Sequence, residues 1–260
     1  MILKENRHVW ELPEDVTTEV FVKFLLEKTK LRSVKLKSRY YKPILRYTWD
    51  QVSPYQLALS LGRNAYLSHG SAVFLHRLTD QVPTTIYLNQ EQTPKPCIKR
   101  ALTQEAVDLA FSRPQRRSSY ILKHEKWRIV VIRGKNTGKL EVGELLGLTG
   151  ERLKVTRLER TLIDIAVRPG YAGGVLQVLE AFEAAKDRVR VSTLVATLKK
   201  LNYVYPYHQA VGFYMERAGY KETSYKKLRS FGLTLNFYLG HGLRDVKYDN
   251  GWRIYYPKGL

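Results

Sequence analysis

The chain has 260 residues and is 44% hydrophobic, so one large domain, or a small domain beside a larger one, can bury a core. No apolar run approaches the ~18 residues of a membrane helix, and the N-terminus lacks the pattern of a secretory signal. The single cysteine, Cys97, excludes an intramolecular disulfide and a cysteine metal cluster. These features predict a cytoplasmic protein.

The charge balance points to a polyanion partner. Lys and Arg number 44 against 24 Asp and Glu, a formal charge of +20. Such an excess is typical of proteins that bind nucleic acid. An anionic membrane is the weaker choice, because no basic helix with an aromatic face is evident. A merely soluble basic protein is the remaining alternative.

Residues 1–52 are predicted to form a small basic unit. A helix from Glu14 or Asp15 to Lys28 is expected to bury Val16, Val20 and Phe24 on one face. Two strands follow, at 33–37 and 44–49. A helix followed by a basic hairpin is how a winged-helix DNA-binding unit ends. Only about 14 residues precede the helix, so the unit is predicted to be incomplete.

The predicted hairpin carries the densest positive charge of the N-terminal part. From Phe21 to Tyr47 there are nine Lys or Arg residues and one acid, Glu27. We predict phosphate contacts from five of the basic side chains, which are Arg32, Lys35, Lys37, Arg39 and Lys42. The alternatives are an ordinary hairpin with a solvated face, or DNA binding at a second basic segment, Lys95 to Lys139.

Residues 53–260 are predicted to form a larger mixed α/β domain, which makes the fold class α+β. Turn residues, caps and periodicity predict its elements. The helices are expected at 55–61, 69–78, 103–111, 193–201, 206–218 and 223–229, and the strands at 84–88, 119–123, 127–133, 153–155, 234–239 and 252–256.

The stretch from 154 to 185 is predicted to be two helices around a sharp turn at the centre of the core. Thr156 and Glu159 have the spacing of a capping box at the start of the first helix. Leu162 and Ile165 recur at helical spacing and define a buried face. Pro169 is expected to end this helix.

After the turn at Gly173 and Gly174, the second helix is expected to bury Val175, Leu179 and Phe182. In the first helix, Arg160 and Asp164 are spaced for an i, i+4 ion pair.

Two blocks of sequence resemble a known family. The first is Glu159-Arg160-Thr161-Leu162-Ile163-Asp164, followed by Arg168-Pro169 and Ala172-Gly173-Gly174. The second, upstream, runs from Tyr66 to Ala72 and from Leu75 to Pro83. Together they resemble AbiEi-type proteins, the antitoxin and transcriptional-regulator half of bacterial type IV toxin–antitoxin systems. The resemblance covers roughly residues 17 to 260.

The resemblance implies a winged-helix-like unit followed by an AbiEi-type C-terminal domain. It implies binding to promoter inverted repeats in double-stranded DNA by a homodimer. It further implies that the C-terminal domain counters a nucleotidyltransferase toxin of a phage-defence operon without forming a tight complex with it. The antitoxin surface is expected around Arg160, Asp164, Arg168 and Tyr171. No enzymatic activity, metal or cofactor is expected.

Two enzyme hypotheses compete with this interpretation. Gly70-Ser71 matches the start of a nucleotidyltransferase motif, but Asp80 is followed by Val82 where a second metal-binding acid is needed. Asp245-Val246-Lys247 has the spacing of a restriction-endonuclease-type metal site, although it is expected in a loop. A third alternative is an interaction subunit that holds RNA or DNA for a partner.

Histidines provide little evidence of a metal site. His69 and His76 are seven residues apart, whereas a zinc helix uses ligands four apart with a third nearby. His208 lies near three tyrosines, Tyr203, Tyr207 and Tyr214, and this group is either a packed aromatic cluster or a binding surface.

Overall fold

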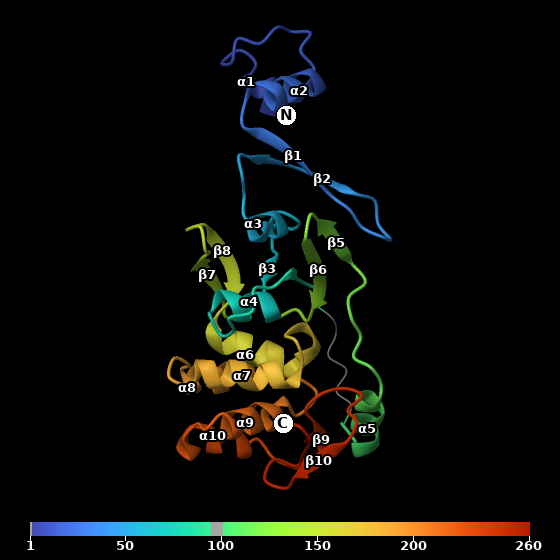
Figure 1. Cartoon of the computed structure of the whole chain (residues 1–260), viewed down its shortest axis with the longest axis vertical. Coiled ribbons are helices and arrows are strands. Elements are labelled where there is room, and N and C mark those ends of the chain that lie inside the picture. The colour runs from blue at the N-terminus through green and yellow to red at the C-terminus, as the bar shows by residue number, and fades with distance from the viewer. Residues whose placement is uncertain (1, 95–100) are drawn as a thin grey trace.

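The computed structural model describes residues 2–94 and 101–260, so Cys97 and the first six residues of the second basic segment, 95–100, lie outside the described residues. Along the long axis of the molecule, the N-terminal helices and a hairpin stand at one end (Figure 1). A six-stranded sheet follows, then a layer of helices, then a second group of helices with a small sheet. The α+β fold class is therefore confirmed.

The N-terminal unit contains α1 (Ile2–Asn6) and α2 (Thr18–Lys28). Thr17 is the N-cap of α2 and accepts a hydrogen bond from the backbone N–H of Val20 at 3.3 Å, so the helix begins later than predicted. The predicted buried stripe is wrong, because Val20 and Phe24 are 56% and 54% exposed. The second helix packs along the first strand of the hairpin and against Trp10, whose ring stacks on Phe21.

The hairpin pairs β1 (Leu31–Leu36) with β2 (Ile44–Trp49) in antiparallel register. Leu36 is fully buried in a core cluster that also contains strands of the main sheet. Backbone hydrogen bonds between Lys37 and Lys123, at 2.9 and 2.7 Å, join the hairpin to that sheet. The boundary predicted at residue 52 thus divides the chain within one shared apolar cluster.

The main sheet has the order β5-β6-β4-β3-β8-β7. Strand β4 is parallel to β6 and β3 is parallel to β8, whereas the other pairs are antiparallel. Helices α3 (Pro54–Leu59) and α4 (His69–Leu75) pack on it. Its strands are β3 (Tyr66–Leu67), β4 (Thr85–Glu91), β5 (Ile121–His124), β6 (Trp127–Gly134), β7 (Val142–Leu146) and β8 (Arg152–Thr156).

The sequence did not predict β7. Its residues, Val-Gly-Glu-Leu-Leu, show no clean apolar alternation, and their burial is only partial. The strand forms because residues 142–146 pair along the length of β8.

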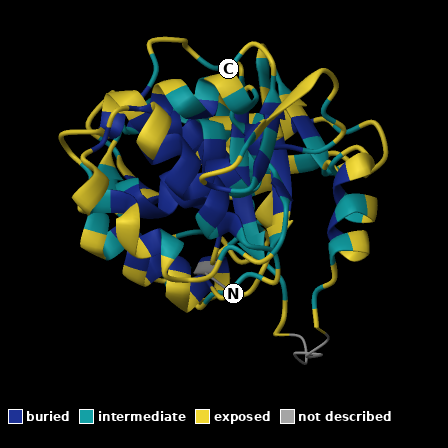
Figure 2. Ribbon diagram, turned by 90° about the horizontal axis from the view of Figure 1, so that it is seen from below, coloured by how far each residue is buried: buried dark blue, intermediate teal, exposed yellow. Residues whose placement is uncertain are grey.

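The remaining helices build the largest apolar core, around Phe182, Tyr214 and Trp252. Figure 2 shows the buried parts of the chain gathered at the centre of the molecule. They are α5 (Gln104–Ser112), α6 (Leu158–Val167), α7 (Val175–Ala185), α8 (Val191–Leu201), α9 (Tyr207–Arg217) and α10 (Glu222–Arg229), with a 3₁₀ turn at Pro169–Tyr171. A small sheet of β9 (Phe237–Tyr238), β10 (Val246–Asp249) and β11 (Ile254–Pro257) completes this core.

The central pair of helices, α6 and α7, follows the prediction in its core but not at its start. Leu162 and Ile165 are fully buried, and α6 ends before Pro169, as predicted. The prediction of a capping box at Thr156 and Glu159 is wrong. Arg157 is the N-cap, and Glu159 instead accepts a hydrogen bond from the backbone of Arg190 at 2.9 Å.

The turn and the second helix were also predicted in part. Gly173 and Gly174 have φ of 95° and 122°, a region that favours glycine. In α7, Phe182 is fully buried as predicted, but Val175 and Leu179 are only partly buried. The buried face is instead formed by Val178, Ala181, Phe182 and Ala185.

The longest helices within residues 2–94 and 101–260 have 11 residues, and none has the length and hydrophobicity needed to cross a bilayer.

Candidate nucleic-acid interface and adjoining cavity

The outward face of the β1–β2 hairpin combines basic and aromatic side chains. Directly opposed residues in an antiparallel pair share a face, and Lys35 is opposite Leu45. On the same face, Tyr47 and Trp49 follow Leu45 at every second position. All three apolar side chains are about half exposed, at 49%, 48% and 60%. An exposed apolar patch beside lysines favours a binding surface.

The structure brings together four of the five predicted DNA contacts. Lys35 lies on the outward face, Lys37 follows β1, and Arg39 and Lys42 lie in the loop that connects the strands. The guanidinium of Arg39 lies over the ring of Tyr40, 5.4 Å from its centroid. Arg32 is separate, because it lies on the opposite face of the hairpin and approaches Asp50 at 4.0 Å.

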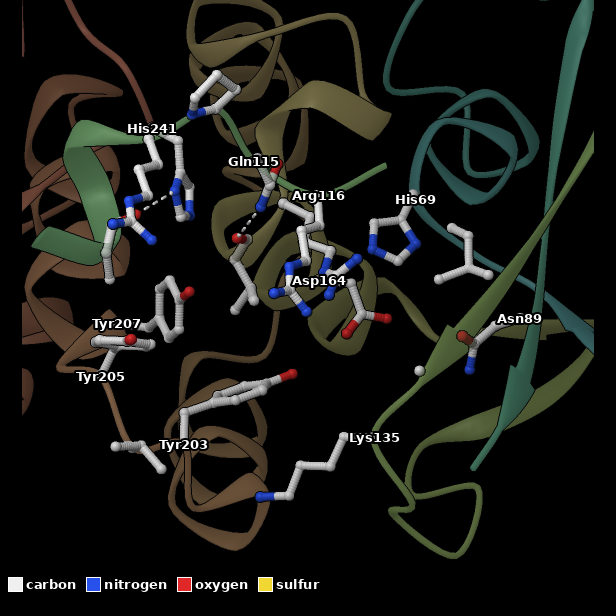
Figure 3. Close-up of a pocket in the computed structure, with 18 of the residues that line it drawn as sticks. His69, Asn89, Gln115, Arg116, Lys135, Asp164, Tyr203, Tyr205, Tyr207 and His241 are labelled. Carbon is white, nitrogen blue, oxygen red and sulfur yellow. Dashed lines mark hydrogen bonds between the residues drawn. The ribbon is translucent and has the colours of Figure 1, made fainter. Parts of the chain in front are cut away.

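A cavity of about 660 Å³ opens where the carboxyl ends of the parallel strands β4 and β6 meet the helices (Figure 3). Ligands of open α/β sheets commonly bind at this end of the strands. The lining residues come from seven separate parts of the chain, and they are His69, Asn89, Ala110, Arg113, Pro114, Gln115, Arg116, Ile132, Gly134, Lys135, Arg160, Asp164, Val167, Arg168, Tyr203, Val204, Tyr205, Tyr207 and His241.

The cavity wall is strongly basic. Five cationic side chains line it, and Asp164 is the one acid among the described lining residues. In the described part of the chain, the guanidinium groups of Arg113, Arg116 and Arg168 form no ion pair. Lys135, in contrast, donates hydrogen bonds to the carbonyls of Leu201, the last residue of α8, and of Asn202, its C-cap. Three arginines are therefore available to an anionic ligand.

The predicted ion pair between Arg160 and Asp164 is confirmed. Arg160 Nε donates to Asp164 Oδ1 at 2.7 Å, and the two side chains are only 5% and 7% exposed. Burial raises the pKa of Asp164, and the attraction of Arg160 opposes that shift. Burial opposes the charge of Arg160, but the attraction and hydrogen bond of Asp164, together with the nearby Tyr203 and Tyr66, raise the guanidinium pKa overall. Arg160 also donates to the carbonyl of Leu140 at 2.8 Å, so it holds the loop after β6.

Tyrosines form another side of the cavity. The rings of Tyr203 and Tyr207 lie 5.3 Å apart between centroids, and those of Tyr205 and Tyr207 6.2 Å apart. Burial raises the pKa of Tyr203 and of Tyr207, so both phenols stay protonated near neutral pH. Among residues 2–94 and 101–260, the three hydroxyls have no hydrogen-bond partner. Each hydroxyl is therefore free to bind a ligand.

The aromatic group that the sequence suggested divides into two parts. Tyr203 and Tyr207 line the cavity, whereas Tyr214 is fully buried in the core. The imidazole of His208 is hydrogen-bonded through Nε2 to the carbonyl of Gly232, at 2.6 Å.

His69 is buried and His76 is partly buried, and both imidazoles make local hydrogen bonds. The Nδ1 atom of His69 lies 2.8 Å from the Ser68 hydroxyl, and His76 Nε2 lies 2.7 Å from the carbonyl of Thr156. Burial, reinforced by the charges of Arg168 and Arg160, lowers the pKa of His69 to about 3. Within the residues that the structure describes, no group of three or more His, Cys, Asp or Glu residues is placed to hold a metal ion.

The expected antitoxin surface is an interior wall. Arg160, Asp164 and Arg168 line the cavity, but Arg160 and Asp164 are buried rather than displayed on a surface as predicted. Tyr171 is buried beside the cavity, where its hydroxyl accepts a hydrogen bond from the backbone N–H of Ser118 at 2.8 Å. Apolar packing around α6 draws these side chains inward.

A neighbouring hollow of about 560 Å³ connects the cavity to the hairpin. It shares Arg116, Ile132 and Arg168 with the cavity, and Tyr41 of the hairpin loop lines it as well. Arg117 and Arg133 add further charge. The arginines at 113–117 were expected only as part of the second basic segment, Lys95 to Lys139. The local cluster Arg-Pro-Gln-Arg-Arg was the available signal.

The nuclease triplet has an exposed position. Asp245 is exposed and precedes β10, which contains Val246 and Lys247, so part of the triplet is in a strand rather than the expected loop. The paired strand β11 has the sequence Ile-Tyr-Tyr-Pro and contributes no acid.

Comparisons with known proteins show a likeness of fold. No protein-family model matches the chain, and no curated protein matches it significantly. The crystal structure of the RV2827C protein from Mycobacterium tuberculosis is similar, with a TM-score of 0.60 at 11% sequence identity. The similarity covers 97% of this chain and 83% of that chain. At this identity it shows the fold alone.

Proposed function

We propose that this protein is an antitoxin and DNA-binding transcriptional regulator of a bacterial toxin–antitoxin operon, acting in the cytoplasm and without catalytic activity of its own. The observation that carries the DNA-binding half is the exposed hairpin, where Lys35 lies opposite half-exposed Leu45 and next to Tyr47 on the same face. Lys37, Arg39 and Lys42 continue the positive charge into the loop that connects the strands. Lysine and arginine contacts to phosphate position a protein on DNA, whereas base contacts specify sequence.

The proposal includes a homodimer on promoter inverted repeats. A two-fold symmetric site is matched by a two-fold symmetric protein. The exposed Val20 and Phe24 on α2 favour a contact between subunits, since half-exposed apolar side chains gain from burial.

The antitoxin half rests on the resemblance of the central helix pair to AbiEi-type proteins. We propose that Arg168, together with the Arg160–Asp164 pair, serves the neutralisation of a nucleotidyltransferase toxin. Arg168 is the accessible member, because the other two side chains are buried. Tyr171 supports the same wall through packing with Arg168, whose guanidinium lies 5.7 Å from the ring centroid.

Binding to the DNA upstream of the gene tests the first half. Purified protein is titrated against a labelled duplex, alongside the variants Lys35→Ser/Lys37→Ser and Lys226→Ser/Lys227→Ser. The control pair lies exposed on α10, at the opposite end of the molecule from the hairpin (Figure 1). We expect only the hairpin variant to weaken binding. Equal loss in both variants would indicate a general charge effect and reject the hairpin as the site.

Co-expression tests the antitoxin half. The neighbouring toxin gene is induced in cells that carry wild type, Arg168→Ser or the control Arg128→Ser, an exposed arginine outside the cavity. The proposal expects growth rescue by wild type and by the control, and poorer rescue by Arg168→Ser. Full rescue by all three would remove Arg168 from the function.

A subunit that holds nucleic acid for a partner is the second candidate. It is favoured by the basic surface that runs from Tyr41 through Arg117 and Arg116 to the cavity. Stronger binding of single-stranded than of double-stranded promoter nucleic acid would support it over the regulator.

A further inference from the structure

We infer that the cavity is a binding site for one nucleotide, with its phosphates at Arg113, Arg116 and Arg168 and its base against Tyr203, Tyr205 and Tyr207. This site goes beyond the proposed regulator, whose DNA contacts lie on the hairpin. The ligand class follows from the charge, the rings and the size of the cavity.

The charge of the wall matches a phosphorylated ligand. The cationic lining residues are Arg113, Arg116, Lys135, Arg160 and Arg168, and Asp164 is the acid, so five positive charges less one negative leave four. Both histidines that line the cavity have lowered pKa values, chiefly because of burial. Guanidinium groups bind phosphate oxygens in pairs of parallel hydrogen bonds. A ligand with a single carboxylate would occupy only one guanidinium group, whereas three without an ion pair line this cavity.

The aromatic side of the cavity matches a base. Figure 3 shows Tyr203, Tyr205 and Tyr207 on one side, His69 and Asn89 on the other, and Asp164 between them. Tyrosine rings stack on nucleobases with little sequence preference. Their three hydroxyls, unpartnered within the described residues, add donors and acceptors for ribose or base edges.

Asp164 adds a fixed acceptor between the two sides. Its Oδ1 atom accepts from Arg160 at 2.7 Å, and no residue in the described ranges hydrogen-bonds its other oxygen. That oxygen is available to a ribose hydroxyl or an exocyclic amine, the donors that a nucleotide carries and inorganic phosphate lacks. Because Arg160 compensates its charge, Asp164 does not cancel the attraction of the free arginines.

The size and the opening of the cavity fit one nucleotide. A volume of about 660 Å³ is within the ~300–1,000 Å³ of small-molecule sites. The neighbouring hollow, which shares Arg116 and Arg168, leaves room for a chain to continue. The bound nucleotide is therefore either a free nucleoside phosphate or the terminal nucleotide of a single strand.

Titration calorimetry on the full chain tests the site with defined probes, namely ATP, inorganic tripolyphosphate, adenosine and a 5′-phosphorylated tetranucleotide. We expect ATP or the tetranucleotide to bind at least tenfold more tightly than tripolyphosphate or adenosine, since only they engage both sides. The tighter of the two identifies the source. The double variant Arg113→Ser/Arg116→Ser should bind at least tenfold more weakly, and both side chains are exposed, so the fold should be kept.

Lys126→Ser/Arg128→Ser is the matched control, because it removes two exposed charges near the opposite end of β6. We expect it to bind the nucleotide within twofold of wild type. The hairpin variant Lys35→Ser/Lys37→Ser should do the same, which separates this site from DNA binding. Absence of binding by both nucleotide probes at about 1 mM, equal affinity for tripolyphosphate, or equal loss in the control would overturn the inference.

Discussion

The salt dependence of DNA binding offers a quantitative test of the hairpin. Each Lys or Arg that neutralises a phosphate releases counterions, so log affinity falls against log salt with a slope of about −0.9 per contact. Because Arg32 approaches Asp50 and lies on the other face, we count four contacts, from Lys35, Lys37, Arg39 and Lys42. Removing Lys35 and Lys37 together should halve that number.

The magnitudes follow from this count. Four contacts predict a slope of about −3.6, so raising salt fourfold, from about 50 to about 200 mM, should weaken binding roughly 150-fold. Two contacts predict a slope of about −1.8 and a loss of roughly 12-fold over the same range. Contacts to backbone change affinity on all sequences alike, so the preference for the promoter should change little.

Fluorescence anisotropy on labelled promoter DNA at several salt concentrations measures both slopes. Wild type, Lys35→Ser/Lys37→Ser and the α10 control Lys226→Ser/Lys227→Ser are compared at matched temperature. The control should keep the wild-type slope. An unchanged slope in the hairpin variant would refute the assignment and move the site to the second basic segment, where the arginines at 113–117 border the cavity.

Three further predictions concern stability and catalysis. Leu162→Ala should lower the free energy of unfolding by ~2–5 kcal/mol, and Leu179→Ala by less because it is only partly buried; equal losses in denaturant titrations would contradict the core assignment. His69 is neutral when folded with a pKa of about 3, whereas the unfolded chain binds a proton near pH 6.5. The free energy of unfolding should therefore be highest above pH 6.5 and should fall by roughly 4–5 kcal/mol as the pH drops toward 3, because the unfolded chain then binds a proton that folded His69 does not. His69→Gln should flatten that part of the plot of stability against pH. With magnesium or manganese, the pure protein should cleave neither plasmid nor RNA and transfer no labelled nucleotide. Turnover that Asp245→Ala abolishes would revive the nuclease hypothesis.

Local sequence signals predicted the centre of the fold well. Leu162 and Ile165 recur at the period of a helix, and their burial requires only that one face meets the core. Pro169 ends α6 because its ring restricts the residue before it. These outcomes depend on a few neighbouring residues, which a single sequence contains.

Features that depend on distant segments could not be predicted in this way. The apolar pattern of α2 is genuine, but burial needs a partner element, and α2 packs along β1 and beside Trp10 rather than on the main core. The cavity is assembled from residues as far apart as His69 and His241. No periodicity within either segment specifies that meeting, so the sequence identified Tyr203 and Arg168 without the site that joins them.

The Arg160–Asp164 pair shows why burial changes the interpretation of a variant. As an exposed i, i+4 pair it would contribute a few tenths of a kcal/mol, and Asp164→Ala would report on function alone. Buried, Asp164→Ala leaves the Arg160 guanidinium with the Leu140 carbonyl and a hydroxyl as partners, and breaking such a pair costs ~3–5 kcal/mol. We therefore expect Asp164→Ala to lower the melting temperature as much as Leu162→Ala does, and Arg160→Met/Asp164→Leu to restore most of it. If Asp164→Ala melts at the wild-type temperature, the ion pair is not buried in solution. Any loss of toxin neutralisation by that variant can then be assigned to function rather than to stability.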